Sequence, residues 1–218
     1  MDRKPGHLTK DVTNAVSSLL WVKMVGVGNA GVGKTSLVKH FCESKFVSGY
    51  QPTVGVDYGF KIQNVNGAEV RVHLWDLSGS TDYLDVRNEL YGLTDAIFLM
   101  FDVHNQSSFD SLETWLREIR SFASGNPEIY LIGNKIDVKQ NRVISVTEAK
   151  KFASQHRFKY YETSAATGEG ITKMMNDFLS SVLARRKPQY PISLSSESAQ
   201  VNSVIDTNMY RQKSAKRK

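Results

Sequence analysis

Residues 28–35 carry the strongest chemical signal in the chain. They read Gly-Asn-Ala-Gly-Val-Gly-Lys-Thr and match the phosphate-binding pattern G-x-x-x-x-G-K-[ST] at every fixed position. An apolar run precedes them and a helical pattern follows, so we expect a bend into a helix N-terminus, where backbone N–H groups hold phosphate. Lys34 would reach the terminal phosphates, and the Thr35 hydroxyl would bind Mg²⁺. The predicted phosphate-binding residues are Asn29, Ala30, Gly31, Val32, Gly33, Lys34, Thr35 and Ser36.

A second motif, Asn134-Lys135-Ile136-Asp137, follows the apolar run 129–132 and should lie at the carboxyl end of a buried strand. There the Asp137 carboxylate can accept two hydrogen bonds from the ring N–H and amine of guanine. Adenine offers neither in that arrangement, so such a site would reject it. The Lys135 stem can lie along the purine, and Asn134 would tie this loop to the phosphate loop.

Two further strand ends complete the pattern. Asp76 closes the predicted strand 70–75 and could hold Mg²⁺ through water, while the Gly79 N–H could meet a γ-phosphate. After the strand near 160, Ser164 and Ala165 would complete the guanine pocket, with the Ala165 N–H donating to the guanine carbonyl. Each segment alone is also typical of an ordinary turn, but the four motifs together predict a guanine-nucleotide site with Mg²⁺.

On these motifs the chain resembles the small GTPases of the Ras superfamily, and within them the Rab branch, from about residue 20 to 184. Further Rab-like features are Pro52–Tyr58, Trp75, Ser107, Phe109 and Trp115. The resemblance implies an α/β fold of the P-loop NTPase class: a six-stranded, mainly parallel sheet with one antiparallel strand and five helices on both faces. It also implies GTP and GDP as bound nucleotides and Mg²⁺ as cofactor.

The resemblance assigns roles to individual residues. Thr53 matches the switch I threonine that binds Mg²⁺ in the GTP state, and Phe46 matches the aromatic ring packed against guanine. Tyr58, Trp75 and Leu90 match the apolar positions that Rab effectors contact, although plain core or surface residues are an equal alternative. The implied partners are effector proteins, an exchange factor and a GAP, with the chain itself a monomer and no sequence-specific nucleic acid bound.

A narrower likeness is to the Rab-like GTPases that carry a C-terminal J domain. It rests on Val86–Glu89, Phe101–Val103 and Ser108–Asp110. We expect no J domain here, because the chain has no His-Pro-Asp signature and only about thirty residues follow its last predicted helix.

The chain departs from the family at Ser80, which follows the Asp76–Gly79 segment where glutamine usually orients the attacking water. A serine hydroxyl is too short for that role, so Lys34 and Gly79 would support a weak hydrolysis with Ser80 as a degenerate catalytic position. Two functions stay open: a switch with slow turnover, or a GTP-bound binding module with negligible turnover. A P-loop kinase using ATP is disfavoured by Asp137.

Composition favours one globular domain. The chain has 218 residues, 40% of them hydrophobic, and a single cysteine, Cys42, so an intramolecular disulfide is excluded. No apolar stretch is long enough to span a bilayer, and the N-terminus lacks a signal peptide's apolar region. We expect a flexible arm over 1–18, a G domain over 19–186 and a disordered basic tail over 187–218.

The net charge of +6 is concentrated near the C-terminus. The basic residues there are Arg185, Arg186, Lys187, Arg211, Lys213, Lys216, Arg217 and Lys218, against Glu197 and Asp206. A solvated end, a weak contact with anionic membrane and a nuclear import signal are the alternatives. The last residues contain no cysteine for prenylation, so we expect a cytoplasmic protein, with nuclear or peripheral membrane association as further options.

Hydrophobic periodicity predicts strands near 20–27, 59–65, 69–76, 96–102, 129–134 and 159–163. Helices are predicted near 34–42, 82–91, 107–123, 147–156 and 171–184, with Thr147-Glu148 and Ser107-Ser108 as N-caps. Asn66-Gly67 is typical of a two-residue hairpin, so the second and third strands should be antiparallel.

Overall fold

The computed structural model describes residues 20–186, and the predicted arm over 1–18 and tail over 187–218 lie outside this range. Six strands form one sheet in the order β2-β3-β1-β4-β5-β6. Their bounds are β1 Leu20–Val27, β2 Val56–Val65, β3 Ala68–Leu77, β4 Ala96–Asp102, β5 Glu128–Asn134 and β6 Lys159–Thr163. All neighbouring strands are parallel except β2 and β3, as the sequence predicted.

The β2–β3 hairpin has the predicted turn. Asn66 and Gly67 adopt φ values of 52° and 85°, and Val65 pairs with Ala68 across the turn. Positive φ at both central positions gives a turn whose twist suits a hairpin, which asparagine and glycine tolerate best. The predicted start of β2 at residue 59 was wrong, because the strand begins at Val56, where pairing with β3 already holds it.

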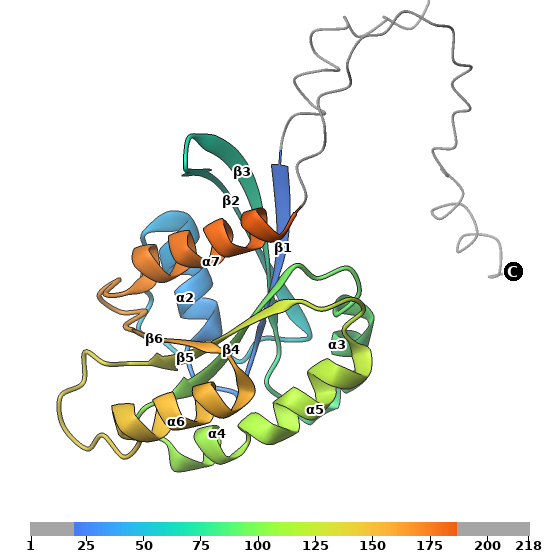
Figure 1. Ribbon diagram of the computed structural model, residues 1–218. Coiled ribbons are helices and arrows are strands. Elements are labelled where there is room, and N and C mark those ends of the chain that lie inside the picture. Colours follow the sequence, from blue (N-terminus) through green and yellow to red (C-terminus); the bar gives the residue numbers. More distant parts are fainter. Residues whose placement is uncertain (1–19, 187–218) are drawn as a thin grey trace, which may run out of the picture. The chain divides into compact units, whose positions relative to one another are not determined.

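Helices cover both faces of the sheet (Figure 1). On one face lie α2 (Lys34–Glu43) and α7 (Ile171–Arg185). On the other lie α3 (Leu84–Leu90), α4 (Gln106–Asp110), α5 (Leu112–Phe122) and α6 (Val146–His156), with a short 3-10 helix η1 (Thr81–Tyr83) leading into α3. The predicted small G-domain architecture is therefore confirmed.

Two local expectations about helices were wrong. The single helix predicted over 107–123 is divided into α4 and α5 at Ser111, whose Oγ donates to the Ser107 carbonyl at 2.7 Å, a bond that often bends helices. The predicted N-caps were also misplaced. Asn105 caps α4 and Ser145 caps α6, because each side chain accepts from the N–H three residues later, at 3.2 and 3.1 Å.

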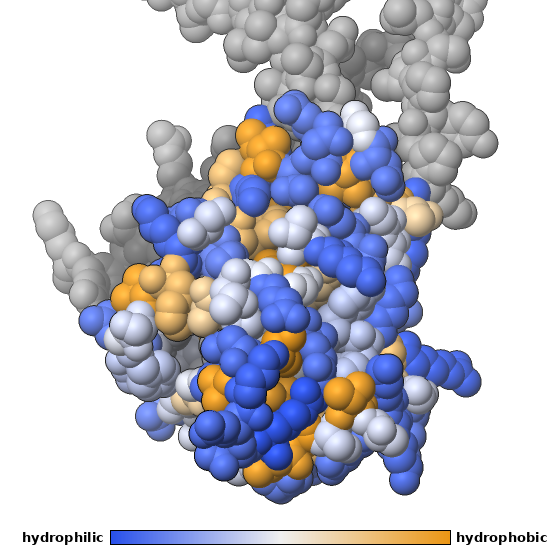
Figure 2. All heavy atoms as spheres, turned by 90° about the vertical axis from the view of Figure 1, so that its left-hand side faces the viewer, coloured by the Kyte–Doolittle hydropathy of each residue, from blue (hydrophilic) through white to orange (hydrophobic). Residues whose placement is uncertain are grey.

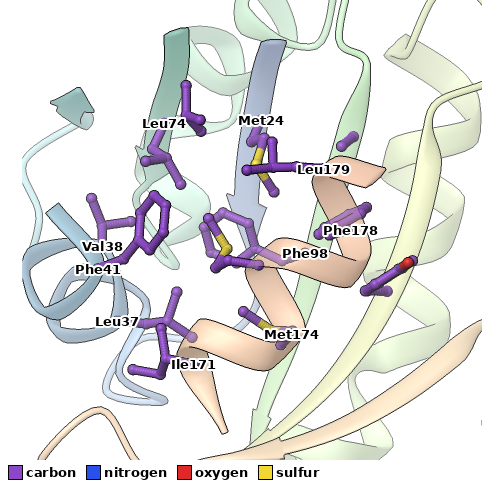
Figure 3. Close-up of a cluster of buried hydrophobic side chains, with 14 of the residues drawn as sticks. Met24, Leu37, Val38, Phe41, Leu74, Phe98, Ile171, Met174, Phe178 and Leu179 are labelled. Atoms are coloured by element: carbon purple, nitrogen blue, oxygen red, sulfur yellow. The ribbon is translucent and has the colours of Figure 1, made fainter. Parts of the chain in front are cut away.

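Strand β4 is buried along its whole length and separates two hydrophobic clusters. The cluster under α2 and α7 appears in Figure 3, where side chains from both helices meet those of the sheet. Its packing is tight at Phe178, whose ring stacks on Tyr130 with centroids 3.7 Å apart. This contact ties α7 to the strand that leads into residues 134–137.

The surface in Figure 2 alternates mostly hydrophilic residues with separate, small hydrophobic patches. Such patches are ordinary on a globular domain. Within residues 20–186, no helix combines the length and the apolar character needed to cross a membrane.

The stacked ring of Phe178 should dominate the stability of the α7 contact. We expect Phe178→Ala to lower the free energy of unfolding by about 3–5 kcal/mol, because it removes a fully buried ring and leaves a cavity. Urea unfolding measures this, with Phe122→Ala as the matched control because the Phe122 side chain is 43% exposed. Equal losses in the two variants would contradict the assignment.

Candidate nucleotide-binding site

The carboxyl ends of β1, β3, β5 and β6 lie at one edge of the sheet, and the loops that follow them surround a cavity of about 690 Å³. Every predicted phosphate- or guanine-binding residue lines it except Asn29, Val32 and Ser164. Fold topology therefore brings together motifs that are far apart in the sequence.

The phosphate loop closes on its neighbours with no room for side chains at two glycines. A Cβ on Gly33, whose φ is 100°, would lie 2.4 Å from Nδ2 of Asn134. A Cβ on Gly79 would lie 2.2 Å from the backbone nitrogen of Ala30. Both contacts are closer than real Cβ atoms approach, so glycine is required where the loops meet.

Lys34 is buried at the start of α2, and its Nζ donates to the carbonyls of Gly28 and Asn29 at 2.7 and 2.9 Å. Burial lowers the pKa of this ammonium to about 8, although the charge of Asp76 acts in the opposite direction. An anionic ligand in the cavity would favour the charged form of this desolvated ammonium group.

Three oxygens converge beside Lys34. Thr35 Oγ1 lies 3.1 Å from Thr53 Oγ1 and donates to Asp76 Oδ2, to which Thr53 Oγ1 also donates at 3.3 Å. Burial raises the pKa of the Asp76 carboxyl, and its Oδ1 is buried without a hydrogen-bond partner. Hydroxyl and carboxylate oxygens are ligands that Mg²⁺ accepts, so this set fits the implied ion.

No group of three or more His, Cys, Asp or Glu that could hold a metal occurs in the described part of the chain. A single carboxylate with two hydroxyls suits Mg²⁺ that is also bound by phosphate oxygens and water, rather than a site built wholly from protein.

Asn134 connects the two halves of the cavity. Its Nδ2 donates to the Val32 carbonyl at 2.9 Å, and its Oδ1 accepts from Thr163 Oγ1 and the Ala165 N–H, both at 3.1 Å. The predicted tie between the two loops is therefore present. The Ala165 N–H, expected to face guanine, is paired with Asn134 instead, so its contact with guanine stays a prediction.

Ser164 does not line the cavity but orients the residue that does. Its Oγ donates to Asp137 Oδ1 at 2.7 Å. This hydrogen bond fixes the orientation of the Asp137 carboxylate. Lys135 has a φ of 73°, and its Nζ lies 2.7 Å from Asp102 Oδ2. Phe46 lines the same cavity and is 47% exposed.

Sequence reasoning missed Asp102 and His104 beside this loop. Asp102 accepts from the His104 N–H at 2.9 Å and pairs with Lys135, while His104 Nε2 donates to the Val138 carbonyl at 3.0 Å. The available signal was a polar residue ending the fully buried strand β4. These contacts brace the loop that carries Asp137.

Comparison with known sequence families identifies the family of this chain. Residues 23–184 match the sequence model of the Ras family. The chain belongs to the Ras family.

Curated relatives of this G domain include proteins named "DnaJ homolog subfamily C member 27". The rat and human proteins are 39% identical over 169 residues, which cover 75% of this chain and 62% of each relative. The "27-B" protein of Xenopus laevis is 36% identical over 172 residues. The chain thus spans less than two thirds of the length of these relatives. Their names agree with the narrower likeness predicted from residues 86–89, 101–103 and 108–110.

Of the three predicted effector-contacting residues in this G domain, Tyr58 and Trp75 lie edge to face, with ring centroids 5.1 Å apart. Trp75 and Leu90 are partly buried against the hydrophobic core. Lys23 joins them, because its Nζ donates to the Leu90 carbonyl at 2.7 Å and lies 5.8 Å from the Trp75 ring centroid. The trio is therefore placed on neighbouring elements, and its role stays a prediction.

Ser80 lines the cavity, but its hydroxyl is committed to local structure. The Oγ accepts from the Asp82 N–H at 3.2 Å and donates to Asp82 Oδ2 at 3.1 Å, so it caps η1. The hydroxyl that replaces the usual glutamine amide of the family is thus engaged with Asp82, which lines the same cavity.

Removal of the Asn134 amide should loosen the whole site. We expect Asn134→Ala to lower the free energy of unfolding by about 1–3 kcal/mol, because it leaves the Val32 carbonyl and the Ala165 N–H unpaired. Thermal unfolding measures this, with Asn126→Ala as control because that side chain is exposed. A loss no larger than the control's would show that the tie contributes nothing.

Proposed function

We propose that the protein is a guanine-nucleotide-dependent switch that binds GTP and GDP with Mg²⁺ and hydrolyses GTP slowly. The observation that carries this proposal is the single cavity lined by both the phosphate loop and the Asn134–Asp137 loop. The two loops are joined through Asn134, so phosphate binding and base recognition occur in one rigid frame. Membership of the Ras family supports the same activity.

Phosphate binding rests on backbone N–H groups of residues 29–36 at the N-terminus of α2 and on Lys34. During hydrolysis, negative charge spreads over the transferred phosphoryl group, and Lys34 and the Gly79 N–H would stabilise it. Thr35, Thr53 and Asp76 would hold Mg²⁺, the last through water, and the ion when bound neutralises charge on the β- and γ-phosphates.

Base recognition rests on Asp137, which Ser164 holds in place at 2.7 Å. A carboxylate with one oxygen fixed by a neighbour presents a pre-oriented acceptor to the guanine ring N–H and amine. The stem of Lys135, held by Asp102, would cover one purine face, and the Phe46 ring would pack edge-on against the guanine.

The switch itself would act through the γ-phosphate, which Thr53, through Mg²⁺, and the Gly79 N–H would bind when GTP is present. Ordering of the segment around Thr53 would change the surface around Tyr58, Trp75 and Leu90, which effector proteins would contact. An exchange factor and a GAP are the further partners, and signalling or vesicle trafficking is the process. We place the protein in the cytoplasm, with the basic tail as a weak membrane contact or import signal.

A GTP-bound scaffold with negligible turnover is the second candidate. The observation that favours it is that the Ser80 hydroxyl donates its proton to Asp82, while this side chain has no amide to orient the attacking water. Single-turnover hydrolysis of pre-bound GTP separates the two functions.

Base choice tests the proposed function directly. We expect the wild type to prefer GTP over ATP by on the order of 10⁴-fold, because adenine would leave the Asp137 carboxylate without the two donors that guanine supplies. Asp137→Asn should weaken guanine binding and favour xanthine, which presents an acceptor where guanine has its amine. Competition against a fluorescent nucleotide measures both, with the exposed Asp110→Asn as control. Equal affinity for ATP and GTP in the wild type would overturn the proposal.

Turnover tests the role of Ser80. Unassisted hydrolysis by Ras is already only ~10⁻⁴ s⁻¹, and the wild type should be slower. Ser80→Gln should accelerate it by about tenfold, less than the 10²–10⁴-fold that a fully positioned general base contributes. Single-turnover assays measure the rates, and Ser80→Ala, which loses the cap without gaining an amide, should give no acceleration. If wild type and Ser80→Gln both hydrolyse GTP at the unassisted rate of Ras, the proposal of a slow switch is contradicted.

A further inference from the structure

Arg87 is a buried cation outside the nucleotide site, at 2% exposure in α3. Its Nε and Nη2 donate to the two carboxylate oxygens of Glu118 at 2.7 and 2.9 Å, as a planar fork. Its Nη1 donates to the Ser78 carbonyl at 3.1 Å and also to the Ser80 carbonyl. One side chain therefore joins α5 to the segment on both sides of Gly79.

The partners of Arg87 are themselves fixed. Tyr91 Oη donates to Glu118 Oε1 at 2.8 Å, and the Trp115 ring lies 4.8 Å from the guanidinium carbon. Trp115 Nε1 in turn donates to Asn29 Oδ1 at 2.7 Å, in the phosphate loop. A continuous set of contacts thus connects the phosphate loop, α5, α3 and residues 78–80.

This arrangement leaves residues 78–83 little freedom. The Ser78 and Ser80 carbonyls are held on either side of Gly79, which already packs against Ala30 with no room for a Cβ. The Ser80 hydroxyl caps η1 through Asp82. Displacement of the segment would leave Nη1 of the buried Arg87 without its two carbonyl acceptors, and an unsatisfied donor on a buried charged group is unfavourable.

We propose that Arg87 is a positioning residue that holds residues 78–83 in one arrangement with GDP and with GTP alike. The change on nucleotide exchange is then confined to the segment around Thr53, and Gly79 is placed for the γ-phosphate before it arrives. This inference rests on the proposed function. In GTPases in which the γ-phosphate orders the segment that corresponds to residues 78–83, that segment rearranges on hydrolysis.

Amide hydrogen exchange of residues 79–83 tests the inference in the wild type. With GDP and with a non-hydrolysable GTP analogue, their exchange rates should agree within about fivefold. The contacts of Arg87 with Glu118, Ser78 and Ser80, which form the clamp, do not need the γ-phosphate. Amides near Thr53 should slow by more than that when the analogue replaces GDP. A slowing of residues 79–83 by more than about fivefold would overturn the inference.

A variant separates positioning from general stability. Arg87→Met/Glu118→Gln removes both buried charges and keeps an acceptor for Tyr91, so the fold should persist. With GDP, exchange at residues 79–83 should rise by at least about tenfold and fall again with the analogue, while the core strand β4 stays protected. Arg117→Met, an exposed arginine on α5, is the matched control and should behave as wild type. A variant with wild-type exchange at residues 79–83 would contradict the clamp.

The same comparison in nucleotide-free protein keeps the two proposals distinct. Failure of the wild type to bind fluorescent GDP would contradict the proposed function. The clamp would then still predict slow exchange at residues 79–83 in the wild type and at least about tenfold faster exchange in the double variant. The absence of that difference would overturn the clamp whatever the nucleotide result.

Discussion

Three loops that are far apart in the sequence meet at the buried side-chain amide of Asn134. It donates to the phosphate loop at Val32 and accepts from Thr163 and Ala165, so one residue sets the distance between the two halves of the cavity. An amide can do this because it has donors and an acceptor in a planar group of fixed geometry. The tight approach of Gly33 to the same amide shows how closely the loops are fitted.

Beside the phosphate loop, two buried polar groups lack part of the solvation or hydrogen bonding that they would have in water. Lys34 is a desolvated cation with a pKa lowered to about 8, and Asp76 has a buried oxygen without a partner. Such groups are unfavourable in a closed interior. They are tolerated here because Lys34 lines the cavity and Asp76 is hydrogen-bonded to Thr35 and Thr53, which also line it. Phosphate and a metal ion of the kind bound by Ras-family domains would complete their interactions there.

Two side chains fix the segment that follows Asp76. Ser80 supplies an N-cap where the family has a glutamine, and Arg87 fastens the same segment to α5. Both features act in one direction, because each adds contacts within the protein that hold residues 78–83. These contacts support the proposals of a preformed segment and slow turnover.

The sequence by itself determined the features that depend on local spacing. The phosphate loop, the Asp137 motif and the Asn66-Gly67 hairpin each follow from residues within a few positions of one another. Local rules were less reliable at element ends, where Ser145 rather than Thr147 caps α6, and pairing with β3 starts β2 at Val56. Tertiary structure alone decided the pairs Arg87–Glu118 and Lys135–Asp102. Their members come from different elements, and only the packing of those elements brings such charges into contact.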